Sequence, residues 1–278
     1  MINVIFGILT RILSNSYLNV FQKILTEGNK CPKNRPSVIN FYTYLGLSIL
    51  SLFLLPYINL IFSSALFVNF LAMGILGALG NYFIIKALSI GELSSLAPIN
   101  SYKPIVAMLF AWFYLKEIPN INSIIGIGLI IIGTYVLANK TNFNSKAVYY
   151  RILALIFSGT EAVFIKKIIL LTNIHTSFLL WAVAGLIFSF IFVIFSKNEI
   201  KPPSSIYLGL LILSVGIMQY STNYVFSKIN VSYALALFQL STILSVFLGI
   251  NIFHEKNLGR KIIASFVMFI GAVIIILN

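Results

Sequence analysis

The chain has 278 residues, of which 59% are hydrophobic and only 9% are charged. Soluble domains carry about 25% charged residues, so this composition excludes a soluble enzyme and a disordered chain, and it indicates a protein that lies in a bilayer. The formal net charge of +13 does not indicate a nucleic-acid partner, because the basic residues cluster between apolar runs, as the positive-inside rule requires of a membrane protein.

Charges and turn residues divide the sequence into ten apolar segments, each long enough for a membrane-spanning helix of about 20 residues. The segments are 2–25, 38–55, 64–88, 93–115, 121–139, 149–171, 175–196, 205–227, 231–253 and 260–277. Such runs indicate helices, because the strands of a membrane β-barrel alternate in polarity and span only about ten residues. We therefore predict an all-α membrane protein with ten transmembrane helices and no cleavable signal peptide.

The second half of the sequence repeats the first. One fixed offset aligns Glu117 with Glu255 and Gly133 with Gly271, and a slightly longer offset aligns Lys23 with Lys166. Each half contains five of the predicted helices, and an odd number means that the halves enter the membrane with opposite orientations. We expect a first five-helix repeat over 1–139, a connecting loop over 140–148 and a second, inverted repeat over 149–278.

Several short motifs fall around the fourth and fifth segments. They are Ala97-Pro98-Ile99, Pro104, Leu115-Lys116-Glu117, Gly126 and Gly133. This pattern resembles the end of an EamA repeat in the drug/metabolite transporter superfamily, which has prolines in the fourth helix, a Glu in the tight turn after it and glycines in the fifth helix. In the second half, Ala236 and Thr242 replace the two prolines. The resemblance implies solute transport and leaves the solute open.

Charged groups at membrane depth usually face a bundle interior or an aqueous cavity. Glu161 lies near the middle of the sixth segment and shares a helix face with Ser158, and Lys103 lies near the middle of the fourth. We predict that both line a central cavity, where they bind substrate and couple transport to protons. The alternative interpretation is a structural pair between these two residues. Arg11 is either a further cavity residue or an interfacial anchor.

Polar and aromatic residues in several of the segments complete the predicted substrate site. With Lys103 and Glu161 it consists of Asn15, Asn19, Tyr44, Asn81, Tyr82, Asn100, Trp181, Gln219, Tyr220, Asn223 and Gln239. Lys166 and Lys167 are expected to extend to the headgroups, and Glu117 and Glu255 to cap a turn or form a loop salt bridge. The six acidic residues are all Glu and the two His are far apart, so we expect no metal and no cofactor.

These features predict a secondary transporter of a small polar metabolite, working by alternating access in the cell (plasma or inner) membrane. Basic groups outnumber acidic groups in the segments, which favours an amino acid or a small organic acid. The alternatives are a cationic drug or metabolite exporter of the same fold and a membrane-embedded enzyme. The sequence does not indicate the oligomeric state.

Loop charges predict the orientation of the chain. On the side that holds both termini the loops carry two basic residues, Lys116 and Lys228. The opposite loops carry twelve: Lys30, Lys33, Arg35, Lys86, Lys140, Lys146, Arg151, Lys197, Lys201, Lys256, Arg260 and Lys261. The positive-inside rule then places both termini outside the cytoplasm, whereas the family resemblance implies the reverse.

Overall fold

The computed structural model describes residues 2–26, 36–60, 62–91, 96–137, 144–195, 206–241, 243–244 and 259–277. Within these ranges every regular element is a helix. The first half contains α1 (Ile2–Thr26), α2 (Pro36–Ser51), η1 (Leu52–Tyr57), α3 (Ser64–Leu88), η2 (Ala97–Tyr102), α5 (Lys103–Leu115) and α6 (Ile121–Leu137). The second half contains α7 (Ser145–Leu171), α8 (Ile174–Phe195), α9 (Ile206–Phe226), α10 (Val231–Phe238) and α12 (Gly259–Ile276).

Most helix ends fall within a few residues of the predicted segments, and two differences have clear causes. Helix α7 begins at Ser145 rather than at residue 149, because the side chain of Asn144 accepts hydrogen bonds from the amides of Lys146 and Ala147 and so caps a helix that starts inside the predicted loop. The predicted segment 93–115 is divided into a 3-10 helix, η2, and an α-helix that starts at Lys103. Pro104 at the start of α5 suits this break, since proline fits the first turn of a helix better than its interior.

Helix α10 also ends early, at Phe238, although the predicted segment ran from residue 231 to residue 253 and has no proline in this part. Gln239 and Leu240 continue in a turn whose amides bond to Ala236 and Leu237. The carbonyl of Ser241 accepts a hydrogen bond of 3.0 Å from the hydroxyl of Ser16 on α1. A side chain from a neighbouring helix therefore satisfies a backbone acceptor at this interruption.

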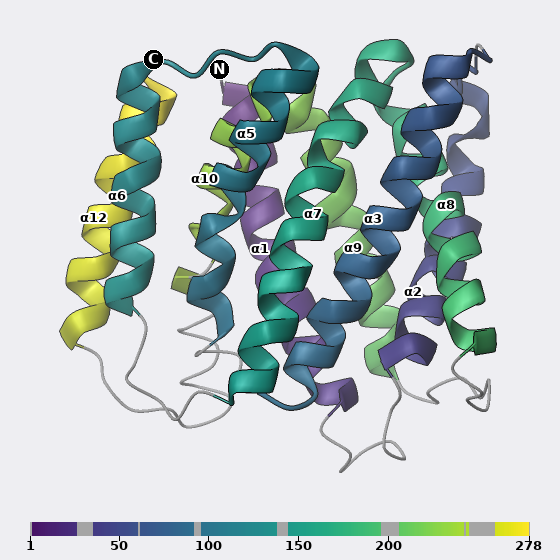
Figure 1. Cartoon of the computed structure of the whole chain (residues 1–278), viewed down its shortest axis with the longest axis horizontal. Helices are drawn as coiled ribbons and strands as arrows, with labels where there is room; N and C mark the ends of the chain where they lie inside the picture. Colours follow the sequence, from purple (N-terminus) through teal and green to yellow (C-terminus); the bar gives the residue numbers. More distant parts are fainter. Residues whose placement is uncertain are drawn as a thin grey trace.

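The helices run side by side in one bundle, and α1 begins at the same end at which α12 finishes (Figure 1). The main packing partners join the two halves of the chain: α1 packs on α9, α2 on α8, α3 on α7 and α6 on α12. Glycines bring α6 and α12 together, because a Cβ at Gly126 would lie 2.7 Å from the carbonyl oxygen of Gly271. Close backbone approach at small residues is the usual way in which membrane helices associate.

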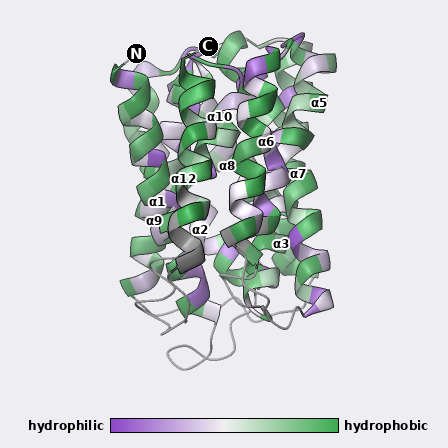
Figure 2. Cartoon of the chain, turned by 90° about the vertical axis from the view of Figure 1, so that its left-hand side faces the viewer, coloured by the Kyte–Doolittle hydropathy of each residue, from purple (hydrophilic) through white to green (hydrophobic). Residues whose placement is uncertain are grey.

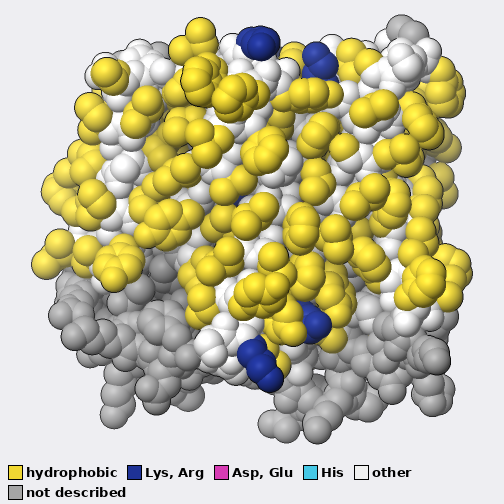
Figure 3. Space-filling model, in the orientation of Figure 1, with side chains coloured by type: hydrophobic (Ala, Val, Ile, Leu, Met, Phe, Trp, Pro, Cys, Tyr) yellow, Lys and Arg dark blue, Asp and Glu magenta, His cyan; other side chains and the backbone are white. Residues whose placement is uncertain are grey.

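The outer surface of the bundle is apolar. Figure 3 shows hydrophobic side chains over most of one face, with the visible basic groups near its upper and lower edges, and Figure 2 shows apolar residues along most helices. Five helical segments in the described part of the chain are long and apolar enough to cross a membrane: Ile2–Thr26, Pro36–Tyr57, Ser64–Leu88, Ile174–Phe195 and Ile206–Phe226. Large apolar side chains are stable at such a surface only in contact with lipid or with protein.

Candidate functional site: a polar cavity inside the bundle

A polar cavity of about 120 Å³ lies among helices α1, α2, α3, α5, α7, α8, α9 and α10, together with η2. This volume is below the roughly 300–1,000 Å³ of sites for drug-sized ligands, so any ligand that the cavity encloses must be small. Nine of the thirteen predicted site residues line it: Asn15, Asn19, Tyr44, Asn81, Asn100, Lys103, Glu161, Trp181 and Gln219.

The other four predicted residues do not line the cavity. Asn223 lies behind Gln219, whose side-chain amide donates to it over 2.9 Å, and Gln239 accepts from Asn100 over 3.4 Å. Both therefore support lining residues from the second layer. The two tyrosines lie elsewhere: Tyr82 accepts a hydrogen bond from Lys86 (3.3 Å), and the Tyr220 hydroxyl contacts His175 Nδ1 (3.1 Å). Their aromatic rings pack between helices instead of forming a cavity wall.

The carboxylate of Glu161 is held in a fixed position on α7. The indole Nε1 of Trp181 on α8 donates a hydrogen bond of 2.6 Å to Glu161 Oε1, and Tyr44 packs edge-on against the same indole with 5.1 Å between ring centroids. Glycine makes room for both groups, because a Cβ at Gly77 would overlap the carboxylate and a Cβ at Gly185 would overlap the Tyr44 ring. Glu161 is 8% exposed, so an aromatic pocket surrounds an acidic group at this point of the cavity.

Lys103 is half-buried at the first position of α5, where the 3-10 helix η2 gives way to an α-helix. Within the described residues its ammonium group forms no hydrogen bond and no ion pair, whereas the charges of Glu161, Arg11 and Arg151 all act on it. Lys103 and Glu161 therefore share the cavity without a direct contact between their side chains, and the structural-pair interpretation lacks the ion pair that it requires.

Two buried arginines also line the cavity. Arg11 on α1 donates from Nε to the hydroxyl of Thr222 over 2.8 Å, and its guanidinium carbon lies 4.9 Å from the centroid of the Phe238 ring. Its Nη1 has no hydrogen-bond partner. Arg151 on α7 is 5% exposed, and its Nε and Nη1 both lack a partner. The loop assignment of Arg151 in the sequence analysis was wrong, since this side chain points into the bundle.

A helical signal for Arg151 was present in the sequence. Arg151, Ser158 and Glu161 are seven and three residues apart, which places all three on one face of a helix. The signal was missed because α7 was expected to begin at residue 149, which left Arg151 in the interfacial turn. The cap at Asn144 adds about one helical turn before residue 149 and draws Arg151 into the cavity wall.

Amide side chains connect the first three helices beside the cavity. Gln22 on α1 donates to Asn81 on α3 over 3.3 Å, and Asn81 donates in turn to Asn40 on α2. The side-chain amide of Asn40 donates a further hydrogen bond of 3.3 Å to the carbonyl of Ala78. Sequence reasoning identified Asn81 but not its two amide partners. A signal for Gln22 was present, because it follows Asn15 by seven residues and Asn19 by three and so shares their helix face. Gln22 also lines the cavity. The network links amide groups of three helices inside the bundle, and the Oε1 atom of Gln22 is buried in it without a hydrogen-bond partner.

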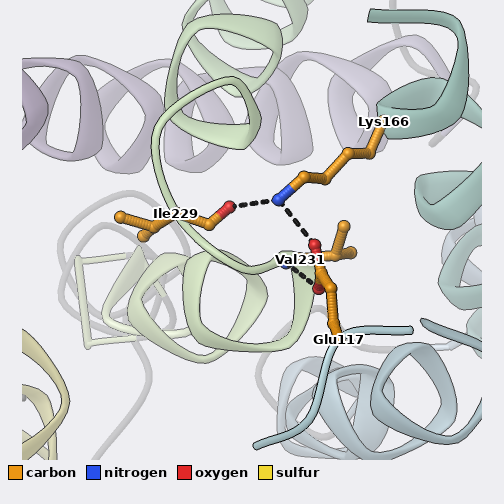
Figure 4. A network of polar contacts seen from close by, with 4 residues as sticks. All are labelled: Glu117, Lys166, Ile229 and Val231. Carbon is orange, nitrogen blue, oxygen red and sulfur yellow. Dashed lines mark hydrogen bonds and ion pairs between the residues drawn. The ribbon is translucent and has the colours of Figure 1, made fainter. Parts of the chain in front are cut away.

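A separate polar cluster lies where the α5–α6 connection meets α7 and the segment before α10 (Figure 4). Lys166 Nζ is 2.6 Å from Glu117 Oε1 and donates to the carbonyl of Ile229 over 2.8 Å. The other carboxylate oxygen of Glu117 accepts from the amide of Val231 over 2.9 Å. The expected salt bridge of Glu117 is confirmed, and the expected extension of Lys166 to the headgroups is wrong, because this side chain is buried in the cluster. Glu255 lies outside the described residues.

The sequence model of the EamA-like transporter family matches residues 3–139 and again residues 145–277. The chain belongs to the EamA-like transporter family. It is thus a multi-pass membrane protein and a membrane transporter of the drug/metabolite superfamily, and the resemblance seen in its motifs is confirmed.

The fold has a counterpart among solved structures. One entitled "Crystal structure of protein" has a TM-score of 0.75 and 16% sequence identity, with 98% of each chain covered. At this identity the likeness concerns the fold alone. No curated protein matches the chain.

Proposed function

We propose that the chain is a secondary transporter that moves a small, carboxylate-bearing polar metabolite by alternating access at the polar cavity. The observation that carries this proposal is the composition of the cavity wall, where buried cationic groups with free N–H donors lie beside one fixed carboxylate. Buried charge is expensive in a membrane protein and usually marks a substrate or proton path. An amino acid or a small organic acid would bring the carboxylate that these cations lack.

The proposed architecture is ten transmembrane helices in two inverted five-helix repeats. Support comes from matching helix contacts. The repeat relates α1 to α7 and α3 to α9, and α1 packs on α9 just as α7 packs on α3. The two lysines that the repeat aligns also have matching partners. Lys23 donates to the carbonyl of Gly91 over 3.0 Å, and Lys166 donates to that of Ile229 over 2.8 Å. Gly91 aligns with Ile229 at the same offset that aligns Glu117 with Glu255.

Alternating access requires two ends that close in turn. The C-terminal ends of α1 and α7, which carry Lys23 and Lys166, lie at opposite ends of the bundle (Figure 1). We propose that these related lysine contacts close the two ends of the cavity, and that at least one of them opens in each half-cycle. The five-helix halves would then rock around the fixed site between them.

Transport by the purified protein in liposomes tests the proposal. Liposomes loaded with unlabelled carboxylates, amino acids or cations are diluted into the same labelled compound, and counterflow is followed over time. We expect saturable counterflow of at least one carboxylate and none in protein-free liposomes. Preferential movement of organic cations would favour the exporter alternative, and chemical conversion without movement would favour the membrane-enzyme alternative. Either result would overturn the proposal.

A further inference from the structure

The charges that line the cavity do not balance. Among the described residues of its wall, Arg11, Lys103 and Arg151 are basic and Glu161 is the single acidic residue. Of the six glutamates in the sequence, the described part contains only Glu117 and Glu161, and Glu117 is engaged with Lys166 in a separate cluster. With all four cavity groups ionised, the described wall carries a net charge of +2.

The two arginines of the cavity wall also lack hydrogen-bond acceptors for some of their N–H groups. Three guanidinium nitrogens, Nη1 of Arg11 and both Nε and Nη1 of Arg151, are buried without a partner. The two side chains are only 9% and 5% exposed. A buried N–H without an acceptor is costly, and a buried cation without a counter-charge more so. Carboxylate and phosphate oxygens fit the planar fork of a guanidinium group and satisfy both needs together.

The three cations form one group although they come from three helices. Arg11 on α1, Lys103 at the start of α5 and Arg151 on α7 all line the same cavity. Helices α1 and α5 belong to the first half of the chain and α7 to the second. An anion bound here would therefore touch both halves of the bundle, as a substrate must if its binding is to influence their relative position.

We infer that the transported metabolite is a small dianion, carrying either two carboxylates or one phosphate monoester. This inference rests on the proposed transport function. It narrows the proposed carboxylates to dicarboxylates and adds the phosphate monoester as a second source of the same double negative charge. A dianion brings the charge of the described cavity wall from +2 to zero. A monocarboxylate leaves one buried cation without a counter-charge, and a zwitterionic amino acid leaves the net charge unchanged. Acceptors on two anionic groups or on a phosphate also match donors that come from two separate arginines.

A series of compounds of equal size tests the charge requirement. Succinate, succinamate and succinamide carry two, one and no carboxylates on the same four-carbon skeleton, and glycerol 3-phosphate supplies the phosphate monoester, with glycerol as its neutral control. Trp181 in the cavity wall reports on binding by its fluorescence once Trp112, the other tryptophan of the chain, has been replaced in a Trp112→Phe variant. We expect a dianion to bind at least about tenfold more tightly than succinamate.

Substitution of Arg151 tests whether the cavity cations impose this preference. Arg151→Gln lowers the charge of the described wall by one, so the advantage of a dianion over succinamate should fall to about threefold or less. Arg151→Lys keeps the charge and should retain most of the advantage. The matched control is Lys86→Gln, which removes a cation in the last turn of α3 that contacts Tyr82 and Tyr150 and does not line the cavity. It should leave the preference intact.

The binding and counterflow results test the dianion inference and the proposed transport function separately. Tighter binding of succinate assigns the dianion to dicarboxylates, and tighter binding of glycerol 3-phosphate assigns it to phosphate monoesters. Equal affinity for succinate, succinamate and glycerol 3-phosphate, together with carboxylate counterflow in liposomes, overturns the dianion inference and leaves the transport proposal standing. Absence of counterflow for every compound of the panel overturns both.

Discussion

Lys166 and Glu117 form a buried ion pair, with 2.6 Å between Nζ and Oε1, that joins α7 to the turn after α5. The turn is shaped for this contact, because Lys116 ends α5 in the left-handed conformation, at a φ of 58°, and the chain reverses immediately before Glu117. The same carboxylate bonds the amide of Val231 at the start of α10. One acidic residue thus holds three segments together at one end of the bundle.

We predict that breaking this pair on one side destabilises the protein more than removing both partners. Glu117→Gln leaves Lys166 buried without its counter-charge, which typically costs about 3–5 kcal/mol. The double change Glu117→Gln with Lys166→Met should recover much of that loss. Melting curves in detergent measure both variants, with Lys167→Met on the adjacent, half-buried residue as control. Additive losses in the double variant would show that the two residues do not stabilise each other.

A second prediction concerns proton coupling by Glu161. Its carboxylate is buried, accepts from Trp181 and lies within electrostatic range of Lys103. Glu161→Gln retains the size of the side chain and its acceptor oxygen but cannot exchange a proton. We expect this variant to fold and to lose uptake driven by a pH gradient. The measurement is uptake in liposomes with and without an imposed gradient, and full gradient-driven uptake by the variant would refute the coupling role.

The third prediction separates substrate binding from structural support at Lys103. Because no ion pair joins Lys103 to Glu161 in the described part of the chain, Lys103→Met should lower substrate affinity by about tenfold or more, through loss of a charge-assisted bond. The melting temperature should change little. A binding isotherm and a melting curve decide the matter. Unchanged affinity, with a loss of stability that Glu161→Gln restores in the double variant, would assign Lys103 to structure.

The fourth prediction concerns orientation. The structure places Arg151 in the cavity wall, so the count for the loops opposite the termini falls from twelve to eleven, against two on the other side. The bias still predicts that both termini lie outside the cytoplasm. Cys31, the only thiol, belongs to the first basic loop and lies outside the described residues. A membrane-impermeant maleimide should not label it in intact cells, and rapid labelling would support the reverse orientation implied by the family.

Much of the fold was predictable because apolar length, charge and proline mark most helix ends directly. The break at Lys103, where one helix was expected over 93–115, had a local signal in the adjacent Pro104. The early end of α10 was not predictable, because a tertiary contact from Ser16 satisfies the carbonyl of Ser241 and no local signal announces it. The start of α7 was missed because its cap, Asn144, stands in a polar stretch that reads as a loop.

The candidate site was predictable where a charge stood alone in an apolar segment, as with Glu161 and Lys103. The aromatic residues that face the cavity could not be predicted in this way, because aromatic residues are frequent throughout the apolar segments. Trp181 faces the cavity, whereas Tyr82 and Tyr220 pack elsewhere. Hydrogen bonds between helices, such as that from Gln22 to Asn81, depend on which helices pack together and on how each is rotated about its axis. The sequence of either helix alone does not determine these.

The proposed transport mechanism requires that substrate pass through the cavity among these helices. Asn19→Cys in a Cys31→Ser background places one thiol on the cavity wall, and Phe113→Cys in the same background places one on the outer surface, where Phe113 is 68% exposed. The measurement is uptake, in liposomes treated with a methanethiosulfonate reagent, of the labelled compound that gives the fastest counterflow. We predict that treatment blocks the Asn19→Cys variant, that excess substrate slows this block, and that the Phe113→Cys variant keeps its activity. Full uptake by a completely modified Asn19→Cys variant would show that substrate does not pass through the cavity.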